Sequence, residues 1–199
     1  MALNKLKFNS INVTPAASKA IRFNSGANGF ETASAGGNMA LIKTQTISSG
    51  TGTVSFVDGT SSVVLDNTYK EYIFYFNNIH PATDNAKLTF QASTDTGSNY
   101  NVAKTTTAYR AYHSEDDAEK ALAYFAGMDL AQGTGFQPIT YYSGIQNDSS
   151  NTGTLTLYNP SSTTFVKHFM ARTNSNNYAA YSPDDFVAGY LNTTSAING

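Results

Sequence analysis

Residues 69–94 constrain the fold of this chain more than any other segment. An aromatic-rich run, Tyr-Lys-Glu-Tyr-Ile-Phe-Tyr-Phe-Asn-Asn-Ile, occupies 69–79, and an alternating run, Ala-Lys-Leu-Thr-Phe-Gln-Ala-Ser-Thr, occupies 86–94. The block between them, His-Pro-Ala-Thr-Asp-Asn, is rich in residues that form turns. Two such runs around a short turn block are typical of neighbouring antiparallel strands. The segment therefore predicts an all-β fold in which these two strands are neighbours.

Further strand signals follow along the chain, separated by clusters of Gly, Pro, Asn and Ser. The spacing is typical of an antiparallel, jelly-roll-like β-sandwich, which we expect over residues 39–199. The chain ends on Ala-Ile-Asn-Gly with no closing turn, an ending that is compatible with a missing final strand. The segment 63–65 is read either as a strand or as a lead into the strand at 69–79. The other expected strands lie at 39–47, 54–56, 105–113, 139–142, 154–158, 163–173 and 186–191.

One short helix is predicted at about 114–126, connecting two strands. Ser114 is a helix-capping residue type, and Asp117 three residues later forms a variant of the capping box. Acidic residues at 115 and 116 favour the positive end of a helix dipole. An apolar stripe with helical spacing follows, made of Ala118, Ala121, Leu122 and Phe125.

Residues 1–38 form an extended N-terminal segment that cannot bury its own apolar side chains. Pro15 and several glycines divide it into short runs, and an isolated ribbon of this kind is marginal in water. One interpretation is a flexible leader that drapes over its own domain. We favour the other, a docking arm that binds other protein subunits. The expected docking residues are Leu6, Phe8, Ile11, Val13, Ile21 and Phe23.

Composition narrows the range of partners. Charged residues make up 13% of the 199 residues and the net charge is -2, so the chain lacks the basic footprint of a nucleic-acid binder. No apolar run approaches the roughly 20 residues that span a bilayer, so we expect no membrane insertion. Asn4, Asn9 and Asn12 interrupt any secretory signal, which indicates assembly in a cytosol.

No catalytic or metal-binding pattern is evident. The histidines His80, His113 and His168 do not form a His-Glu-x-x-His, His-x-His or similar motif. Asp184 and Asp185 are an adjacent acidic pair beside a proline, which is typical of a turn rather than of two facing carboxylates. We therefore expect no enzyme activity, no cofactor and no bound metal.

Three tyrosines are candidates for a ligand loop. Tyr100, Tyr141 and Tyr142 lie in expected loops or strand ends, where aromatic rings stack on the apolar face of a sugar. The alternative is that these rings belong to the core edge or to a subunit contact.

Several segments resemble the β-rich domain of virion structural and tail-fibre-like proteins of marine tailed bacteriophages. The similarity is carried by Tyr-Ile-Phe-Tyr-Phe-Asn-Asn-Ile-His-Pro-Ala-Thr-Asp-Asn-Ala at 72–86, by Asn-Ser-Gly-Ala-Asn-Gly-Phe-Glu at 24–31 and by Lys-Thr-Gln-Thr-Ile-Ser-Ser at 43–49. It covers most of residues 20–199. The resemblance implies a self-associating sandwich on the particle exterior, assembled in the host cytoplasm.

Two functions are expected on this basis. The first is a structural protein of a tailed-phage virion, either a tail fibre or appendage or a head decoration, which binds other virion proteins and forms a homotrimer by analogy with similar assemblies. The alternative is a carbohydrate-binding module that recognises a host surface glycan.

Overall fold

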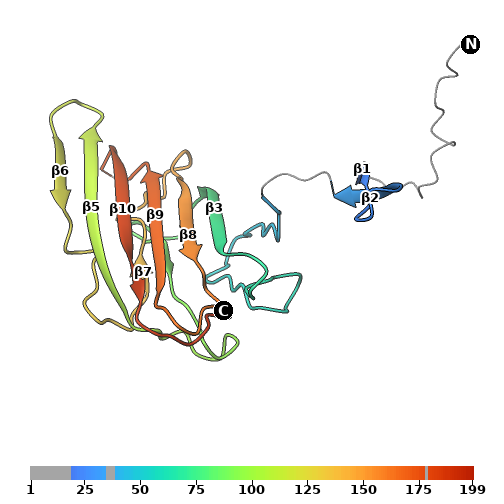
Figure 1. Cartoon of the computed structure of the whole chain (residues 1–199). Helices are drawn as coiled ribbons and strands as arrows, with labels where there is room; N and C mark the ends of the chain where they lie inside the picture. Colours follow the sequence, from blue (N-terminus) through green and yellow to red (C-terminus); the bar gives the residue numbers. More distant parts are fainter. Residues whose placement is uncertain (1–18, 35–38, 178) are drawn as a thin grey trace, which may run out of the picture. The chain divides into compact units, whose positions relative to one another are not determined.

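The structure is a computed structural model that describes residues 19–34, 39–177 and 179–199. These residues form β-strands and no α-helix, so the described part of the chain is all-β. Contacts divide the chain into two units, Met1–Thr44 and Gln45–Gly199. Figure 1 shows the strands of both units, coloured along the sequence.

The first unit contains one antiparallel hairpin. Strand β1 (Lys19–Phe23) pairs with β2 (Phe30–Ser34), and Arg22 and Glu31 form an ion pair of 2.9 Å across it. The turn is closed by a hydrogen bond from the Asn24 N–H to the Gly29 carbonyl (2.9 Å). The two strands bring the rings of Phe23 and Phe30 into register on one face.

The second unit is built on a six-stranded antiparallel sheet in the order β3-β8-β9-β10-β5-β6. Strands β8, β9 and β10 follow one another as a meander, and β5 then pairs with the far side of β10. The edges are β3 and β6, as Figure 1 shows. The strands are β3 (Glu71–Ile79), β5 (Lys104–Ser114), β6 (Lys120–Tyr124), β8 (Asn151–Tyr158), β9 (Lys167–Ser175) and β10 (Tyr181–Leu191).

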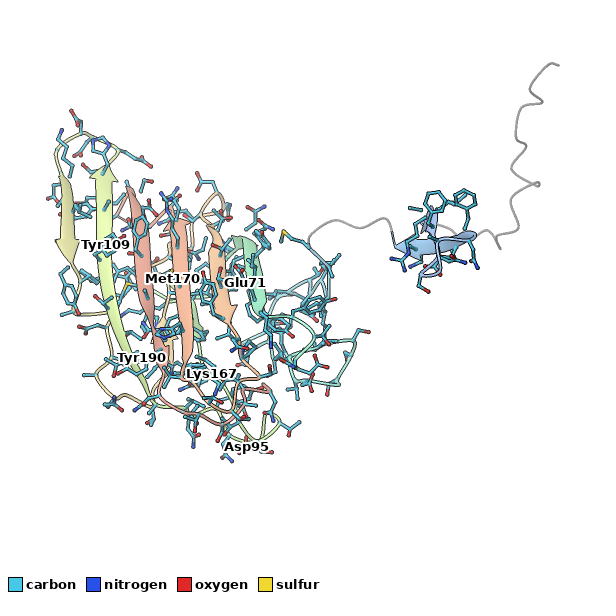
Figure 2. The ribbon with its side chains drawn as sticks, viewed as in Figure 1. Glu71, Asp95, Tyr109, Lys167, Met170 and Tyr190 are labelled. Atoms are coloured by element: carbon cyan, nitrogen blue, oxygen red, sulfur yellow. The ribbon has the colours of Figure 1, made fainter. Side chains whose placement is uncertain are left out.

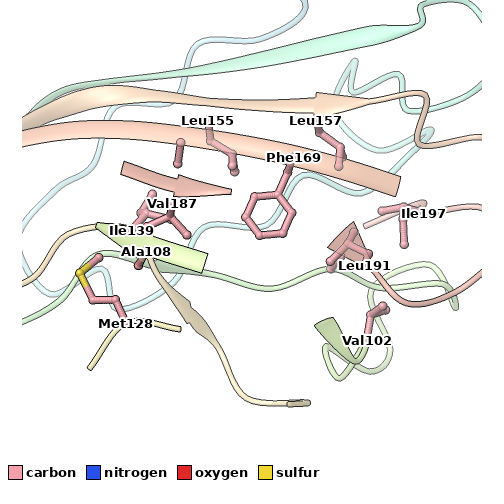
Figure 3. Packing of buried hydrophobic residues seen from close by; sticks show 12 residues of the cluster. Val102, Ala108, Met128, Ile139, Leu155, Leu157, Phe169, Val187, Leu191 and Ile197 are labelled. Carbon is pink, nitrogen blue, oxygen red and sulfur yellow. The ribbon is translucent and has the colours of Figure 1, made fainter. Parts of the chain in front are cut away.

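The core lies on one face of this sheet. Burial alternates along β9 and β10, as the two-residue period of a strand requires. A short second sheet, β4 (Thr89–Phe90) with β7 (Gln137–Pro138), and the loops around it contribute the other side of the core. Figure 3 shows the ring of Phe169 inside this cluster. The buried residues from outside the large sheet include Ala92, Val102, Met128, Ile139 and Ile197.

The expected pairing of 69–79 with 86–94 is wrong. Strand β3 pairs with β8, whereas β4 belongs to the separate two-stranded sheet. A register shift between Phe76 and Ile79, with Asn78 at a φ of 52°, breaks the β3 ladder. The His80 ring then hydrogen-bonds to the Ser149 carbonyl (2.8 Å), and the chain crosses to the other layer. The turn between these two segments therefore connects strands that lie in different sheets.

The expected helix at 114–126 is also wrong, because this segment is a tight turn followed by β6. The Ser114 N–H donates to the Glu119 carbonyl and the Ser114 Oγ accepts from the Glu119 N–H, both at 2.8 Å, which closes a hairpin. Asp117 has a φ of 60°, which a right-handed helix does not allow. Lys120–Tyr124 then pairs back onto β5.

Of the other expected strands, some are present in the structure and some are not. Strands are present at 69–79, 105–113, 154–158, 163–173 and 186–191, and their ends differ from the expected ones by at most five residues. The segments 39–47, 54–56, 63–65 and 139–142 form no strand. In the loop that contains 63–65, the Asp58 carboxylate accepts from the Leu65 N–H (2.8 Å), so a side chain replaces a ladder bond.

Candidate functional site

A shallow pocket of about 210 Å³ lies where β5 ends and β10 begins. Strand β5 supplies Arg110 and Tyr112, and β10 supplies Tyr181. The turn between β5 and β6 adds Glu119, and the segment after β7 adds further tyrosines. We call this hollow the Arg110 pocket; its lining includes Arg110, Tyr112, Glu119, Tyr141, Tyr142, Asn177 and Tyr181.

Arg110 packs against aromatic rings and forms no hydrogen bond or ion pair with an acidic side chain of the described residues. Its guanidinium carbon lies 4.3 Å from the ring centre of Tyr141, 4.4 Å from that of Phe125 and 5.1 Å from that of Tyr112. Such cation–π contacts fix the group electrostatically without using its N–H donors. The Nε atom is buried and has no hydrogen-bond partner among the described residues. The pocket therefore contains a rigid cation with unused donors.

Asp185 lies directly opposite Arg110 in the register of β10 and β5. It is 1% exposed, and its Oδ2 atom accepts from the Tyr141 N–H (2.9 Å), whereas Oδ1 has no partner among the described residues. Burial raises the pKa of Asp185 to about 6, against the opposing effects of the Tyr141 N–H and the Arg110 charge. The expectation of a turn at Asp184 and Asp185 is wrong, since both lie within β10.

Hydrogen bonds fix the rim of the pocket. The Tyr181 hydroxyl donates to the Glu119 carboxylate (2.9 Å), and this bond raises the pKa of Tyr181. The Asn177 Oδ1 atom accepts from the N–H groups of Ala179 (3.0 Å) and Tyr181 (3.1 Å). A hydroxylated ligand would therefore meet preoriented polar groups.

Two of the three predicted ligand-loop residues line this pocket. Tyr141 and Tyr142 lie with ring centres 3.9 Å apart, and the Lys87 ammonium lies 5.5 Å and 5.3 Å from the two ring centres. Tyr100 does not join them, because it precedes the start of β5 whereas the pocket lies near the end of that strand. Its hydroxyl is buried beside Gly97.

Arg110 carries no motif that would identify it in the sequence. The available signal is its place in the alternation of 105–113, where even-numbered residues share the face that packs against the core. A charged residue on that face is uncommon, but Lys104 shares the face and is buried with its ammonium on the Gly135 carbonyl, so this signal alone does not identify a site.

Those predicted docking residues that the structure describes lie on the hairpin. Ile21, Phe23 and Phe30 lie on one face and are 41%, 65% and 45% exposed, and the two phenylalanine rings stack with centres 4.9 Å apart. We call these three residues the hairpin face. The predicted docking residues Leu6, Phe8, Ile11 and Val13 lie outside the described residues.

The face of the large sheet that points away from the core is the second apolar surface. We call it the outer face; Figure 2 marks Tyr109 and Met170 on it. A stacked pair, Tyr109 and Phe186, lies across β5 and β10 with ring centres 4.6 Å apart. Its exposed large side chains are Ile73, Tyr75, Tyr109, Leu122, Tyr124 and Met170.

No group of three or more His, Cys, Asp or Glu residues that could hold a metal is found within 19–34, 39–177 and 179–199. Over the same ranges no helix is long and apolar enough to cross a membrane. His113 lies on the surface, paired with Asp117 at 2.8 Å.

Comparison with known proteins gives no relative from which a function could be transferred. Any functional inference for this chain therefore starts from its own residues. No family model matches the chain, and no curated protein or solved structure matches it either.

Proposed function

We propose that this protein is a non-enzymatic structural subunit on the exterior of a tailed-bacteriophage virion, as a tail fibre, appendage or head decoration. The observation that carries the proposal is the separate hairpin with its exposed hairpin face. The phage context rests on the sequence resemblance described above.

The hairpin face needs a partner surface for a simple energetic reason. A two-stranded hairpin is marginal alone, and full burial of a large apolar side chain contributes about 1.5–3 kcal/mol. Ile21, Phe23 and Phe30 gain little of this within their own unit, because each is more than 40% exposed. Docking onto another virion subunit would bury all three and order the hairpin at the same time.

The second unit is proposed to be a jelly-roll-like β-sandwich that forms a homotrimer. The large sheet and the layer over its core face support the sandwich. The outer face supports self-association, because aromatic residues and methionine are enriched in the centres of subunit interfaces.

Assembly into particles tests the docking role. Phages that carry Phe23→Ser with Phe30→Ser should produce a folded protein that is lost from purified virions, as measured by quantitative mass spectrometry. Ala20 and Ala33 form a matched cross-strand pair on the opposite face of the hairpin. Changing both of these to Ser should leave incorporation unchanged. Normal incorporation of the phenylalanine variant would contradict the proposal.

A second candidate, recognition of host surface carbohydrate, is favoured by the Arg110 pocket. Tyrosine rings, an amide and charged groups converge there, as in sites that bind small polar ligands. Binding of the full chain to a glycan array, lost in Tyr141→Ala and retained in Tyr75→Ala on the outer face, is the expected result. An array on which no glycan is bound would exclude this role.

A further inference from the structure

Arg110 offers hydrogen-bonding capacity that the protein itself does not use. A guanidinium has five N–H donors in a fixed plane. No described residue forms a hydrogen bond or ion pair with this one, although its Nε is buried. Buried donors in native proteins are normally satisfied, and the pocket side is where a ligand acceptor would reach this group.

The geometry favours an anion with two coplanar oxygens. The ring centres of Tyr141, Phe125 and Tyr112 lie 4.3 to 5.1 Å from the guanidinium carbon, which restrains the group, and Arg110 is one of the residues that line the pocket. A carboxylate matches the guanidinium edge with two parallel hydrogen bonds.

The charges around the pocket disfavour a ligand with two negative charges. Arg110 and the Lys87 ammonium near the Tyr141 and Tyr142 rings are positive. Glu119 on the rim and Asp185 opposite Arg110 oppose them. A dianion such as a phosphate monoester would meet repulsion from these acids, whereas one carboxylate adds a single charge.

The volume and the lining residues of the pocket indicate which class of molecule the carboxylate belongs to. A volume of about 210 Å³ is below the roughly 300–1,000 Å³ of sites for drug-sized ligands, so it suits one small ring. Tyrosine rings offer apolar contact to the C–H groups of a pyranose, and the Asn177 amide offers hydrogen bonds to its hydroxyls.

We infer that the Arg110 pocket binds one acidic sugar residue of a polysaccharide, with the sugar carboxylate on the Arg110 guanidinium. This inference rests on the second candidate function, carbohydrate recognition, and names its ligand class. Neither motif nor resemblance identifies this site; the placement of Arg110 among the tyrosines does.

The test is calorimetric titration of the full chain with two matched ligands. One is a glucuronate-containing hexasaccharide, and the other is the same oligosaccharide with its carboxyl groups reduced to hydroxymethyl groups. The acidic form should bind at least about ten-fold more tightly. In Arg110→Gln this advantage should disappear. In Arg172→Gln, which changes an arginine paired with Asp184 outside the pocket, it should remain.

A second variant keeps the test valid if Arg110→Gln does not fold. Glu119→Gln removes a negative charge from the rim and still accepts from the Tyr181 hydroxyl. It should tighten binding of the acidic oligosaccharide about three-fold and leave the reduced one unchanged. An unchanged affinity for the acidic form would contradict the inference.

The remaining outcomes distinguish a failure of this inference from a failure of the carbohydrate-recognition function on which it rests. Equal binding of both oligosaccharides overturns the acidic-sugar class and leaves carbohydrate recognition standing. Binding of neither overturns both. Acidic binding that persists in folded Arg110→Gln overturns the location. Equally tight binding of a glutamate-rich hexapeptide overturns the sugar and indicates a protein partner.

Discussion

At the scale of single residues, Asp185 makes stability depend on pH. Its pKa in the folded state is raised to about 6 from 3.8, mainly by burial. Between pH 4 and 6 the folded state therefore holds a proton that the unfolded state has released. The contribution of Asp185 to the free energy of unfolding is therefore fully present below pH 4 and is lost as the pH rises through 6.

Asp185→Asn should abolish that loss, because an amide does not titrate and still accepts from the Tyr141 N–H. Relative to this variant, the original protein should lose up to about 3 kcal/mol of unfolding free energy between pH 4 and 7. Urea unfolding across that pH range measures it. The control is Asp184→Asn, whose carboxylate pairs with Arg172 at 2.7 Å and should contribute at most about 1 kcal/mol. Parallel pH profiles for Asp185→Asn and the original protein would contradict the expectation.

The sequence alone does not reveal which charged residues are buried, because their burial depends on contacts with distant segments. Asp184 and Asp185 follow a proline and resemble a turn, yet pairing with β5 and β9 holds them in a strand. Lys104 and Lys167 are fully buried, and loop carbonyls accept from their ammonium groups. These loops come from distant parts of the chain, so no local pattern reveals the contact.

At the scale of elements, the C-terminal part of β10 depends on a close approach of backbones. A Cβ atom at Gly189 would lie 2.5 Å from the Thr105 carbonyl oxygen and 2.9 Å from the Thr106 Cα. Gly189→Ala should therefore destabilise the protein by about 1–3 kcal/mol, measured by urea unfolding. Gly52→Ala, with no atom within 4 Å of its Cβ, should stay within about 0.5 kcal/mol. Equal effects of the two changes would show that the strands are not so closely packed.

The β5–β6 hairpin depends on Ser114. Its hydroxyl donates to Asp116 (2.6 Å) and accepts from the Glu119 N–H (2.8 Å). Ser114→Ala should cost about 1–2 kcal/mol and accelerate amide hydrogen exchange at 120–124 while β9 stays protected. Ser182→Ala, an exposed serine on β10, is the control and should leave exchange at 120–124 unchanged. Protection of 120–124 that survives Ser114→Ala would contradict this role.

The elements divide into those that the sequence predicts and those that it does not. Long aromatic or alternating runs such as 69–79 and 105–113 form strands, because their period of two matches a sheet with one buried face. The segment after Ser114 fits both a helical stripe and a strand alternation. Pairing with β5 decides between them, and that pairing is a tertiary effect absent from the local sequence.

At the scale of the whole molecule, the two units should be separable. The buried hydrophobic residues of the described chain all lie between Val63 and Ile197. Removal of residues 1–44 should leave a protein that melts cooperatively within a few degrees of the full chain, as followed by circular dichroism. A broad transition or loss of strand signal would show that the first unit stabilises the second.

The all-β class was accessible from the sequence, but the arrangement was not. Aromatic content and turn spacing predict strands, whereas the order β3-β8-β9-β10-β5-β6 depends on long-range pairing. The Arg110 pocket likewise joins β5, β10 and the segment after β7. Tyr141 and Tyr142 could be suspected as site residues, but their convergence with Arg110 required the fold.

The most direct test of the proposed role is electron microscopy of intact, purified phage particles labelled with an antibody against the second unit. A subunit on the virion exterior predicts label at fixed, repeated positions on the tail appendages or on the head surface of unopened particles. Absence of label from both intact and disrupted particles, with the protein present in the lysate of infected cells, would contradict it.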